Sequence, residues 1–232
     1  MLASVHLVDC GPRLVVKTAR RGRELRRVAG LRYGEVTLTA ALGPRLLPEP
    51  TRGRLGMFAF WEREEALEEF LAANPVARTF AAGWHLRLQP TRIVGGWPQI
   101  DESALGSSAM DDGEPAAALT LGLLRPSQAP RFLRASARAE GLALKSPGLV
   151  ASTGFARPPR LVSTFSVWKT TAAMRSYVEG AHGGAHRDAV RAHAERPFHR
   201  ESAFIRFRLL GVKGDPSAWP GLSELEPALA GA

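Results

Sequence analysis

The chain has 232 residues, which suits one large domain or two domains of about 100 residues each. With 45% hydrophobic and 23% charged residues, it can bury a core and lacks the composition of a disordered chain. The single cysteine, Cys10, excludes an internal disulfide framework and any metal site built on Cys-x-x-Cys pairs. The first 21 residues make a poor secretory signal, and no apolar run approaches the roughly 18–20 residues that cross a bilayer. We therefore expect a cytoplasmic protein without a transmembrane segment.

The net charge of +9 and the pI of 10.8 would ordinarily suggest a nucleic-acid or membrane-surface partner. However, only four of the 31 basic residues are lysine, and the sequence is rich in Ala, Gly and Pro, a bias typical of GC-rich coding. Apart from a short run at residues 20–27, which could form one helix face, the basic residues are scattered. No aromatic-rich basic motif accompanies them, so the sequence does not favour nucleic-acid binding.

Apolar periodicity predicts the elements in chain order. In the first half they are strands at 4–9 and 58–61, helices at 23–31 and 64–73, and a closing strand at 84–88. In the second half they are strands at 117–124 and 161–168, helices at 130–140, 171–179 and 185–196, and a closing strand at 204–210. Thr170 or Thr171 can cap the helix at 171–179 through its side-chain oxygen.

An internal repeat relates the two halves. Trp61 aligns with Trp168, 107 residues later, and Phe58 then falls on Phe165. We read each half as β-α-β-α-β and predict an α+β fold, in which tandem ferredoxin-like halves form a dimeric α/β-barrel type fold within one chain. The bare faces of the two sheets would pack together, with helices outside. The expected divisions are a first half at 1–95, a mobile linker at 96–115, a second half at 116–214 and a surface tail at 215–232.

Four of the six histidines fall within eighteen residues of the second half, at His182, His186, His193 and His199. On a helix at 185–196, His186 shares one apolar face with Ala189, Val190 and His193. Three interpretations stay open: histidines that only pack, a non-haem metal site for which no inward carboxylate pair is visible, and one axial ligand for haem iron.

The closing strand adds a second candidate feature. Arg206 and Arg208 project to one side of it, while the apolar residues between them project to the other. The two arginines could pair with haem propionates or polarise bound oxygen, or they could form a solvated row. Phe165, on the preceding strand, offers an apolar wall for a pocket.

The region at 161–211 resembles the C-terminal half of spheroidene monooxygenase-type proteins, the bacterial carotenoid ketolases. The residues that carry the resemblance are Thr164-Phe165-Ser166-Val167-Trp168, Gly184-Ala185-His186, Glu201 and Arg206-Phe207-Arg208. The resemblance implies a dimeric α/β-barrel that holds haem b in its C-terminal half. His186 matches the family's histidine and would bind the iron, and Arg206 and Arg208 match its strand arginines and would be catalytic. His182, His193 and His199 have no clear counterpart.

We accordingly expect a haem-dependent, monooxygenase-like oxidoreductase that acts on a hydrophobic or small organic substrate. The cofactor would contact His186, Phe165, Val190 and Arg206. An electron-donor protein and a homo-oligomer are the expected partners. One alternative is a haem enzyme of the same fold that dehydrates or rearranges a nitrogen-containing substrate without oxidation. Another is a cofactor-free barrel that binds a small ligand.

Overall fold

The computed structural model describes residues 1–232 except 102–104, 106–108, 181–183, 216–218, 224 and 226–232. The first half contains β1 (Leu2–Asp9), α1 (Pro12–Arg21), the 3₁₀ helix η1 (Gly22–Arg27), β2 (Leu31–Ala41), β3 (Glu49–Trp61), α2 (Glu64–Ala73), α3 (Pro75–Phe80) and β4 (Trp84–Gly96). The second contains β5 (Ala116–Leu124), η3 (Pro126–Gln128), α4 (Ala129–Ala143), β6 (Leu149–Arg157), β7 (Leu161–Trp168), α5 (Thr171–Val178), α6 (Ala185–Glu195) and β8 (His199–Gly214). A last 3₁₀ helix, η4 (Pro220–Leu222), follows.

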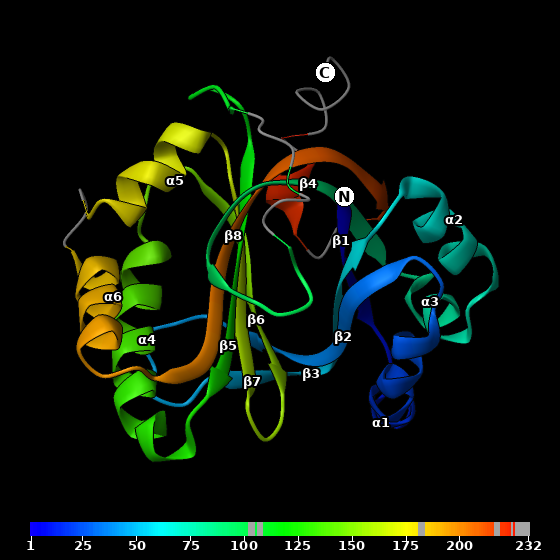
Figure 1. Ribbon diagram of the computed structural model, residues 1–232, viewed down its shortest axis with the longest axis horizontal. Coiled ribbons are helices and arrows are strands. Elements are labelled where there is room, and N and C mark those ends of the chain that lie inside the picture. The colour runs from blue at the N-terminus through cyan, green and yellow to red at the C-terminus, as the bar shows by residue number, and fades with distance from the viewer. Residues whose placement is uncertain (102–104, 106–108, 181–183, 216–218, 224, 226–232) are drawn as a thin grey trace.

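The eight strands form one closed antiparallel barrel in the order β1-β3-β2-β6-β7-β5-β8-β4 (Figure 1). Each half supplies four neighbouring strands, and the pairs β4–β8 and β2–β6 join the halves. The α+β fold of two ferredoxin-like halves is therefore confirmed. Within each half, however, a β-hairpin stands between the helices, so the β-α-β-α-β reading is corrected to β-α-β-β-α-β. The missed strands are β2 and β6.

The barrel interior is filled by side chains that alternate along every strand. Aliphatic side chains and aromatic rings share it, because the inward residues of the strands are apolar and are stabilised by burial away from water. The buried interior rings include Phe58, Phe60, Phe155, Phe165 and Phe207. The inside of the barrel is thus the core of the protein.

The helix expected at 23–31 is wrong. The helix lies earlier, at α1, where Pro12 occupies the first turn and has no backbone N–H that needs a partner. Val15, Thr18 and Ala19 form the inward face of α1, and the following residues tighten into η1 before β2 begins at Leu31. By contrast, α2 spans the expected residues, and the Thr170 hydroxyl caps α5 by accepting a hydrogen bond from the backbone N–H of Ala173 at 3.0 Å.

Parts of the expected linker and tail are packed rather than loose. Trp97 and Ile100 form a β-bridge and are about 95% buried against the barrel interior. Beyond β8, Trp219 packs on Trp84 with ring centroids 5.0 Å apart, and Leu222 is fully buried. Apolar side chains in both segments therefore close the barrel ends. Among the described residues, no helix is long and apolar enough to cross a bilayer.

Two histidines face each other across strands β1 and β4. His6 is directly opposite His85, and their rings stack at a centroid distance of 4.8 Å. The Ser4 hydroxyl is 2.9 Å from His6 Nε2 and also accepts a hydrogen bond from the indole of Trp61. Burial, with a smaller contribution from the facing imidazole, lowers the pKa of His6 well below its usual value. Burial and the nearby Arg87 lower the pKa of His85 to about 4.

The buried pair of His6 and His85 predicts that the folded protein loses stability as the pH falls from about 6.5 to 4. In that range the unfolded chain takes up protons on both imidazoles and the folded chain resists them, so the free energy of unfolding should fall as the pH falls. Urea unfolding at pH 7.5, 6 and 5 measures this slope. The variant His85→Gln should have a shallower slope than the wild type. Identical slopes in the two proteins would contradict the assignment.

Candidate functional site

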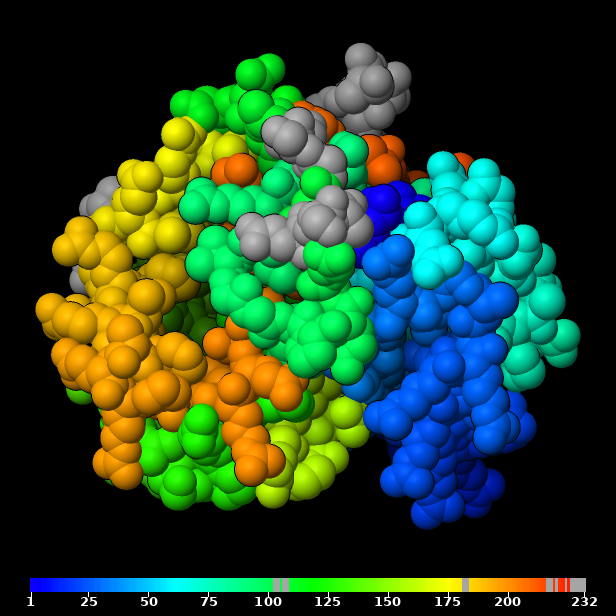
Figure 2. Space-filling view, viewed as in Figure 1, coloured from blue at the N-terminus to red at the C-terminus, as the bar shows by residue number. Residues whose placement is uncertain are grey.

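The outer face of the second half is incompletely covered. Along β7 the residues alternate between buried and half-buried, so its outward side chains remain partly accessible. On the equivalent strand of the first half, residues 55–61 of β3 are buried on both faces. The helix α6, which has no fully buried residue, packs mainly on α4 and α5 and contacts the sheet at His199 of β8 through His193. We call the space between α4, α5, α6 and the outer face of β5, β7 and β8 the helix-side hollow; Figure 2 shows the surface hollowed beside the orange residues of α6.

Side-chain size explains why the two halves differ here. The 107-residue repeat sets each outward residue of β3 against one of β7. The apolar set Leu55, Met57 and Ala59 corresponds to the smaller or more polar set Val162, Thr164 and Ser166. A methionine in the first half contacts the helices that cover it, whereas a threonine at that position cannot reach as far. The helix-side hollow follows from these substitutions.

Strand register defines the floor of the hollow. Thr164 is opposite Thr120, which in turn is opposite Phe204. In the next row, Ala118 lies between Ser166 and Arg206. The floor therefore consists mainly of small side chains and hydroxyls, with Phe204 and Arg206 along one side.

His186 lies in the first turn of α6, on the side of the helix that turns inward. Gly184 caps the start of this helix with a φ of 72°. Glycine suits this position because it adopts the left-handed region without steric cost. The His186 ring is half-buried, 5.3 Å from the ring of Tyr177, whose hydroxyl donates to the Ala139 carbonyl of α4. Burial lowers the pKa of His186, so the imidazole is neutral at neutral pH and able to act as a ligand.

Two residues expected beside His186 are placed elsewhere. Val190 is 56% exposed, so the expected face of α6 is corrected: Ala189 and His193 lie on the inward side and Val190 faces solvent. Phe165 is fully buried inside the barrel, on the opposite face of β7 from the helices. Strand alternation separates it from the helix-side hollow, so Phe165 and Val190 do not line a common pocket with His186.

His193 is engaged in a backbone hydrogen bond. Its Nδ1 accepts from the N–H of Phe198 at 3.2 Å. Burial lowers the pKa of His193, so the ring is neutral and its single proton resides on Nε2. A ring in this state has no unused nitrogen lone pair for a metal ion.

His199 is packed against the sheet. A Cβ atom on Gly122 would lie 2.5 Å from the His199 ring, and Phe132 of α4 contacts the other side of the ring at a centroid distance of 5.0 Å. Its Nε2 is buried and has no partner among the described residues. Burial, with a contribution from His193, lowers the pKa of His199 to about 4. The close packing leaves no space for a metal ion at this nitrogen, and His182 lies outside the described residues.

Arg206 belongs to a group of cations at one edge of the hollow. It is directly opposite Arg92 in the β4–β8 ladder, an arrangement of like charges that destabilises a sheet. Burial and the nearby Arg92 and Arg175 lower the pKa of Arg206. Arg206 bonds to the Thr91 hydroxyl at 3.4 Å, and among the described residues it has no carboxylate partner. An anion bound here would relieve the repulsion.

Arg208 is engaged differently. Its guanidinium donates to the Glu114 carboxylate at 2.7 Å, to Gln89 at 3.3 Å and to the backbone carbonyl of Ala109 at 2.8 Å. These bonds fasten the segment before β5 to β8. Arg208 therefore acts as an anchor in this geometry, and its cationic group is already neutralised.

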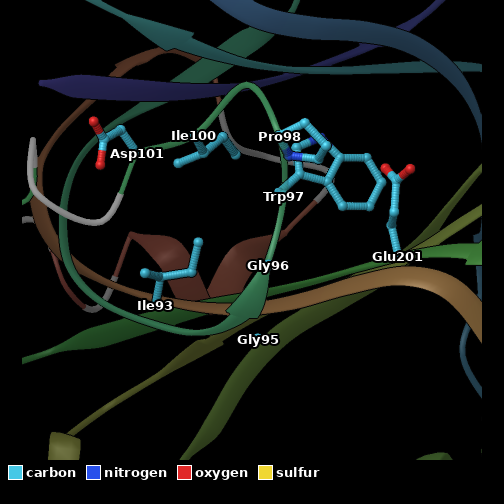
Figure 3. A pocket seen from close by; sticks show the side chains of 8 residues that line it. All are labelled: Ile93, Gly95, Gly96, Trp97, Pro98, Ile100, Asp101 and Glu201. Atoms are coloured by element: carbon cyan, nitrogen blue, oxygen red, sulfur yellow. The ribbon is translucent and has the colours of Figure 1, made fainter.

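A second concavity lies at an end of the barrel. It is an open groove of about 610 Å³, and its ionisable lining residues, Asp101 and Glu201, are both acidic. Figure 3 shows the Glu201 carboxylate beside the indole ring of Trp97. Among the described residues, neither a histidine nor an arginine lines this groove, so it does not match the predicted haem site. In the same parts of the chain, no group of three histidine, cysteine or carboxylate side chains could hold a bare metal ion.

Sequence comparison supplies independent information. The chain is 33% identical to the spheroidene monooxygenase of Rubrivivax gelatinosus over 177 residues, covering 74% of this chain and 65% of that protein. It is 26% identical to the spheroidene monooxygenase of Cereibacter sphaeroides over 192 residues, covering 81% of this chain and 58% of that protein. The chain resembles spheroidene monooxygenases. The predicted resemblance is thus confirmed, over less than two thirds of the length of these two relatives.

Other comparisons add little to this resemblance. No protein-family model matches the chain. Among solved structures, a ferredoxin-fold protein from Listeria monocytogenes, described as related to antibiotic biosynthesis monooxygenases, is 11% identical, with a TM-score of 0.34. That match covers 90% of this chain and 94% of the other. An identity and a TM-score this low support no inference about the function of this chain.

The structure adds site residues that the sequence did not indicate. Arg92 and Arg175 come from β4 and α5, far from Arg206 in sequence, and strand register and helix packing bring them together. Thr120 reaches the floor in the same way. The hydroxyl-rich pattern of β7, read against the apolar pattern of β3, is the one sequence signal that could have indicated the hollow.

The contact between Gly122 and His199 is testable by stability. Gly122→Ala should lower the free energy of unfolding by about 1–3 kcal/mol, because the new methyl group must displace a packed ring. Gly43→Ala is the matched control, since its Cβ would meet no atom within 4 Å. Urea unfolding measures both variants. A loss for Gly122→Ala no greater than for Gly43→Ala would show that His199 does not pack as described.

Proposed function

We propose that this chain is a haem-dependent monooxygenase that acts on a hydrophobic or small organic substrate, with haem b in the helix-side hollow. The supporting observation concerns the histidines. Of the three described in the second half, His193 has no unused lone pair and His199 has no space at its Nε2. His186 alone among them combines a neutral imidazole with a place on the wall of the hollow.

The other residues of the hollow fit a planar, dianionic group. The side chains of the floor are small or carry hydroxyls, and Thr120 and Thr164 stay half-buried, so the helices do not cover them completely. Among the described residues, Arg206 and Arg92 make no ion pair with a carboxylate, whereas the neighbouring Arg175 is paired with Asp112, so the propionates of haem would be suitable partners for Arg206 and Arg92. We assign iron ligation to His186 and propionate binding to Arg206, and we place Arg208 outside the reaction as an anchor.

Haem bound here would supply oxygen activation, which is chemistry of the cofactor rather than of side chains. A monooxygenase reaction consumes one O₂, two electrons and two protons for each oxygen atom inserted, so the proposal includes an electron donor. The chain's own contribution is to hold the imidazole neutral, to neutralise the propionates and to keep the floor apolar or hydroxyl-lined. The curated relatives are named for spheroidene, and we infer a hydrophobic substrate for this chain from that name.

Replacement of the proposed ligand gives the most direct test. His186→Ala should lose the Soret band and the haem content measured as pyridine haemochrome, because the iron would have no axial imidazole. His193→Ala is the matched control on the same helix and should keep both. Circular dichroism checks that both variants fold. A colourless wild type after expression with ample haem, or equal haem content in His186→Ala, would overturn the proposal.

Substitutions of Arg206 and Arg208 should have different effects on haem affinity and on stability. Arg206→Gln should weaken haem binding by about 10- to 100-fold, the value of a charge-assisted hydrogen bond, while the free energy of unfolding of the apo-protein stays unchanged or rises. Arg208→Gln should leave haem affinity unchanged and lower the free energy of unfolding by about 1 kcal/mol. Haem titration and urea unfolding measure the two quantities. The opposite pattern of effects would contradict the roles of propionate partner for Arg206 and anchor for Arg208.

Turnover assays distinguish the reaction class. Product formation by the holo-protein should require both oxygen and an electron donor. Turnover of a nitrogen-containing substrate in the absence of both would instead support a dehydration or rearrangement and would contradict a monooxygenase.

A further inference from the structure

The surface formed by α1 and η1, residues 12–27, carries most of the net charge of the protein. It contains seven cations and one carboxylate, a net charge of +6 out of +9 for the whole chain. The cations are Arg13, Lys17, Arg20, Arg21, Arg23, Arg26 and Arg27. Basic residues are spread over the rest of the chain, but they are concentrated in this segment, which lies at the margin of the first half (Figure 1).

All seven cations are exposed, and none makes an ion pair with another described residue. On α1 they follow helical spacing: Arg13, Lys17, Arg20 and Arg21 lie on one face, because positions i, i+4, i+7 and i+8 align. The opposite face packs on the protein, where the Thr18 hydroxyl lies 3.3 Å from the hydroxyl of Thr79. The cationic stripe thus faces solvent as a fixed surface. Its charges repel one another, and no ion pair with a described carboxylate offsets this repulsion.

Exposed apolar side chains lie among these cations. Leu14 is 37% exposed and Val16 is 53% exposed. Val15, between them, packs against the core of the first half, so the core does not use Leu14 or Val16. An exposed helix face that combines arginine and lysine with aliphatic side chains is the pattern of helices that lie in the interface of a membrane.

We propose that the α1–η1 surface docks on an anionic lipid bilayer. The seven cations would face phosphate headgroups, and Leu14 and Val16 would insert at the boundary of the acyl chains. The apolar component favours a membrane over a nucleic acid, because exposed leucine and valine find no partner along a phosphate backbone and no aromatic residue for base stacking occurs in residues 12–27. The surface lies on the opposite side of the barrel from α4–α6, so this inference does not depend on haem binding (Figure 1).

Vesicle co-sedimentation of the full chain tests the proposal. The wild type should bind vesicles of phosphatidylglycerol and phosphatidylcholine and should not bind pure phosphatidylcholine. The triple variant Lys17→Gln/Arg20→Gln/Arg21→Gln should lose about 100-fold in affinity, from about 1 kcal/mol for each basic residue near the surface. The matched control is Arg134→Gln/Arg138→Gln/Arg200→Gln, which removes the same charge from exposed residues elsewhere and should keep its affinity.

A second variant tests the apolar component. Leu14→Ser/Val16→Ser leaves the charge unchanged and should weaken vesicle binding, with the remaining binding more sensitive to salt. Thermal unfolding checks that all variants are folded. Equal losses in the two triple variants would show that only net charge matters and would overturn the proposal. Binding of duplex DNA that the α1 triple variant abolishes, with no binding of anionic vesicles by the wild type, would assign the surface to nucleic acid instead.

Discussion

The burial of two apolar sheet faces against each other is the constraint on which the rest of the structure depends. Each ferredoxin-like half presents one face to helices and leaves the other bare, and closure through the β4–β8 and β2–β6 pairs turns both bare faces into a single interior. Aromatic rings such as Phe58 and Phe165 fill this interior. Because the barrel centre is packed, a binding site for a large ligand has to lie on an outer face or at a barrel end.

The two outer faces have diverged from one repeat. In the first half, α2 and α3 pack closely on β1 and β3, and Met57 and Trp61 are fully buried. In the second half, Met174 of α5 packs on Trp168 of β7, but Thr164 and Ser166 stay half-buried. One copy thus acts as a structural support, and the other keeps space between sheet and helices. This difference between the two halves follows from the volumes of a few outward side chains, because the topology of the two halves is the same.

Hydrogen bonding and packing, rather than residue type, distinguish the histidines and arginines. His193 uses the Nδ1 lone pair for the Phe198 N–H, and His199 packs on Gly122, which leaves His186 as the described imidazole suited to a ligand. Arg208 is neutralised by Glu114, whereas Arg206 lies among other cations. Residues that are equivalent in a sequence pattern thus acquire different chemical roles from their neighbours.

The sequence alone was enough for the fold class, for most helices and for the side of β8 on which Arg206 lies. These features depend on local periodicity and on a repeat that includes Trp61 and Trp168. The sequence did not predict β2 as a strand, and it led us to expect Phe165 and Val190 beside His186. Only the tertiary structure decided those points. Which sheet face a helix covers, and which distant cations such as Arg92 meet Arg206, depend on strand register and on how closely the helices pack, and neither is encoded in local spacing.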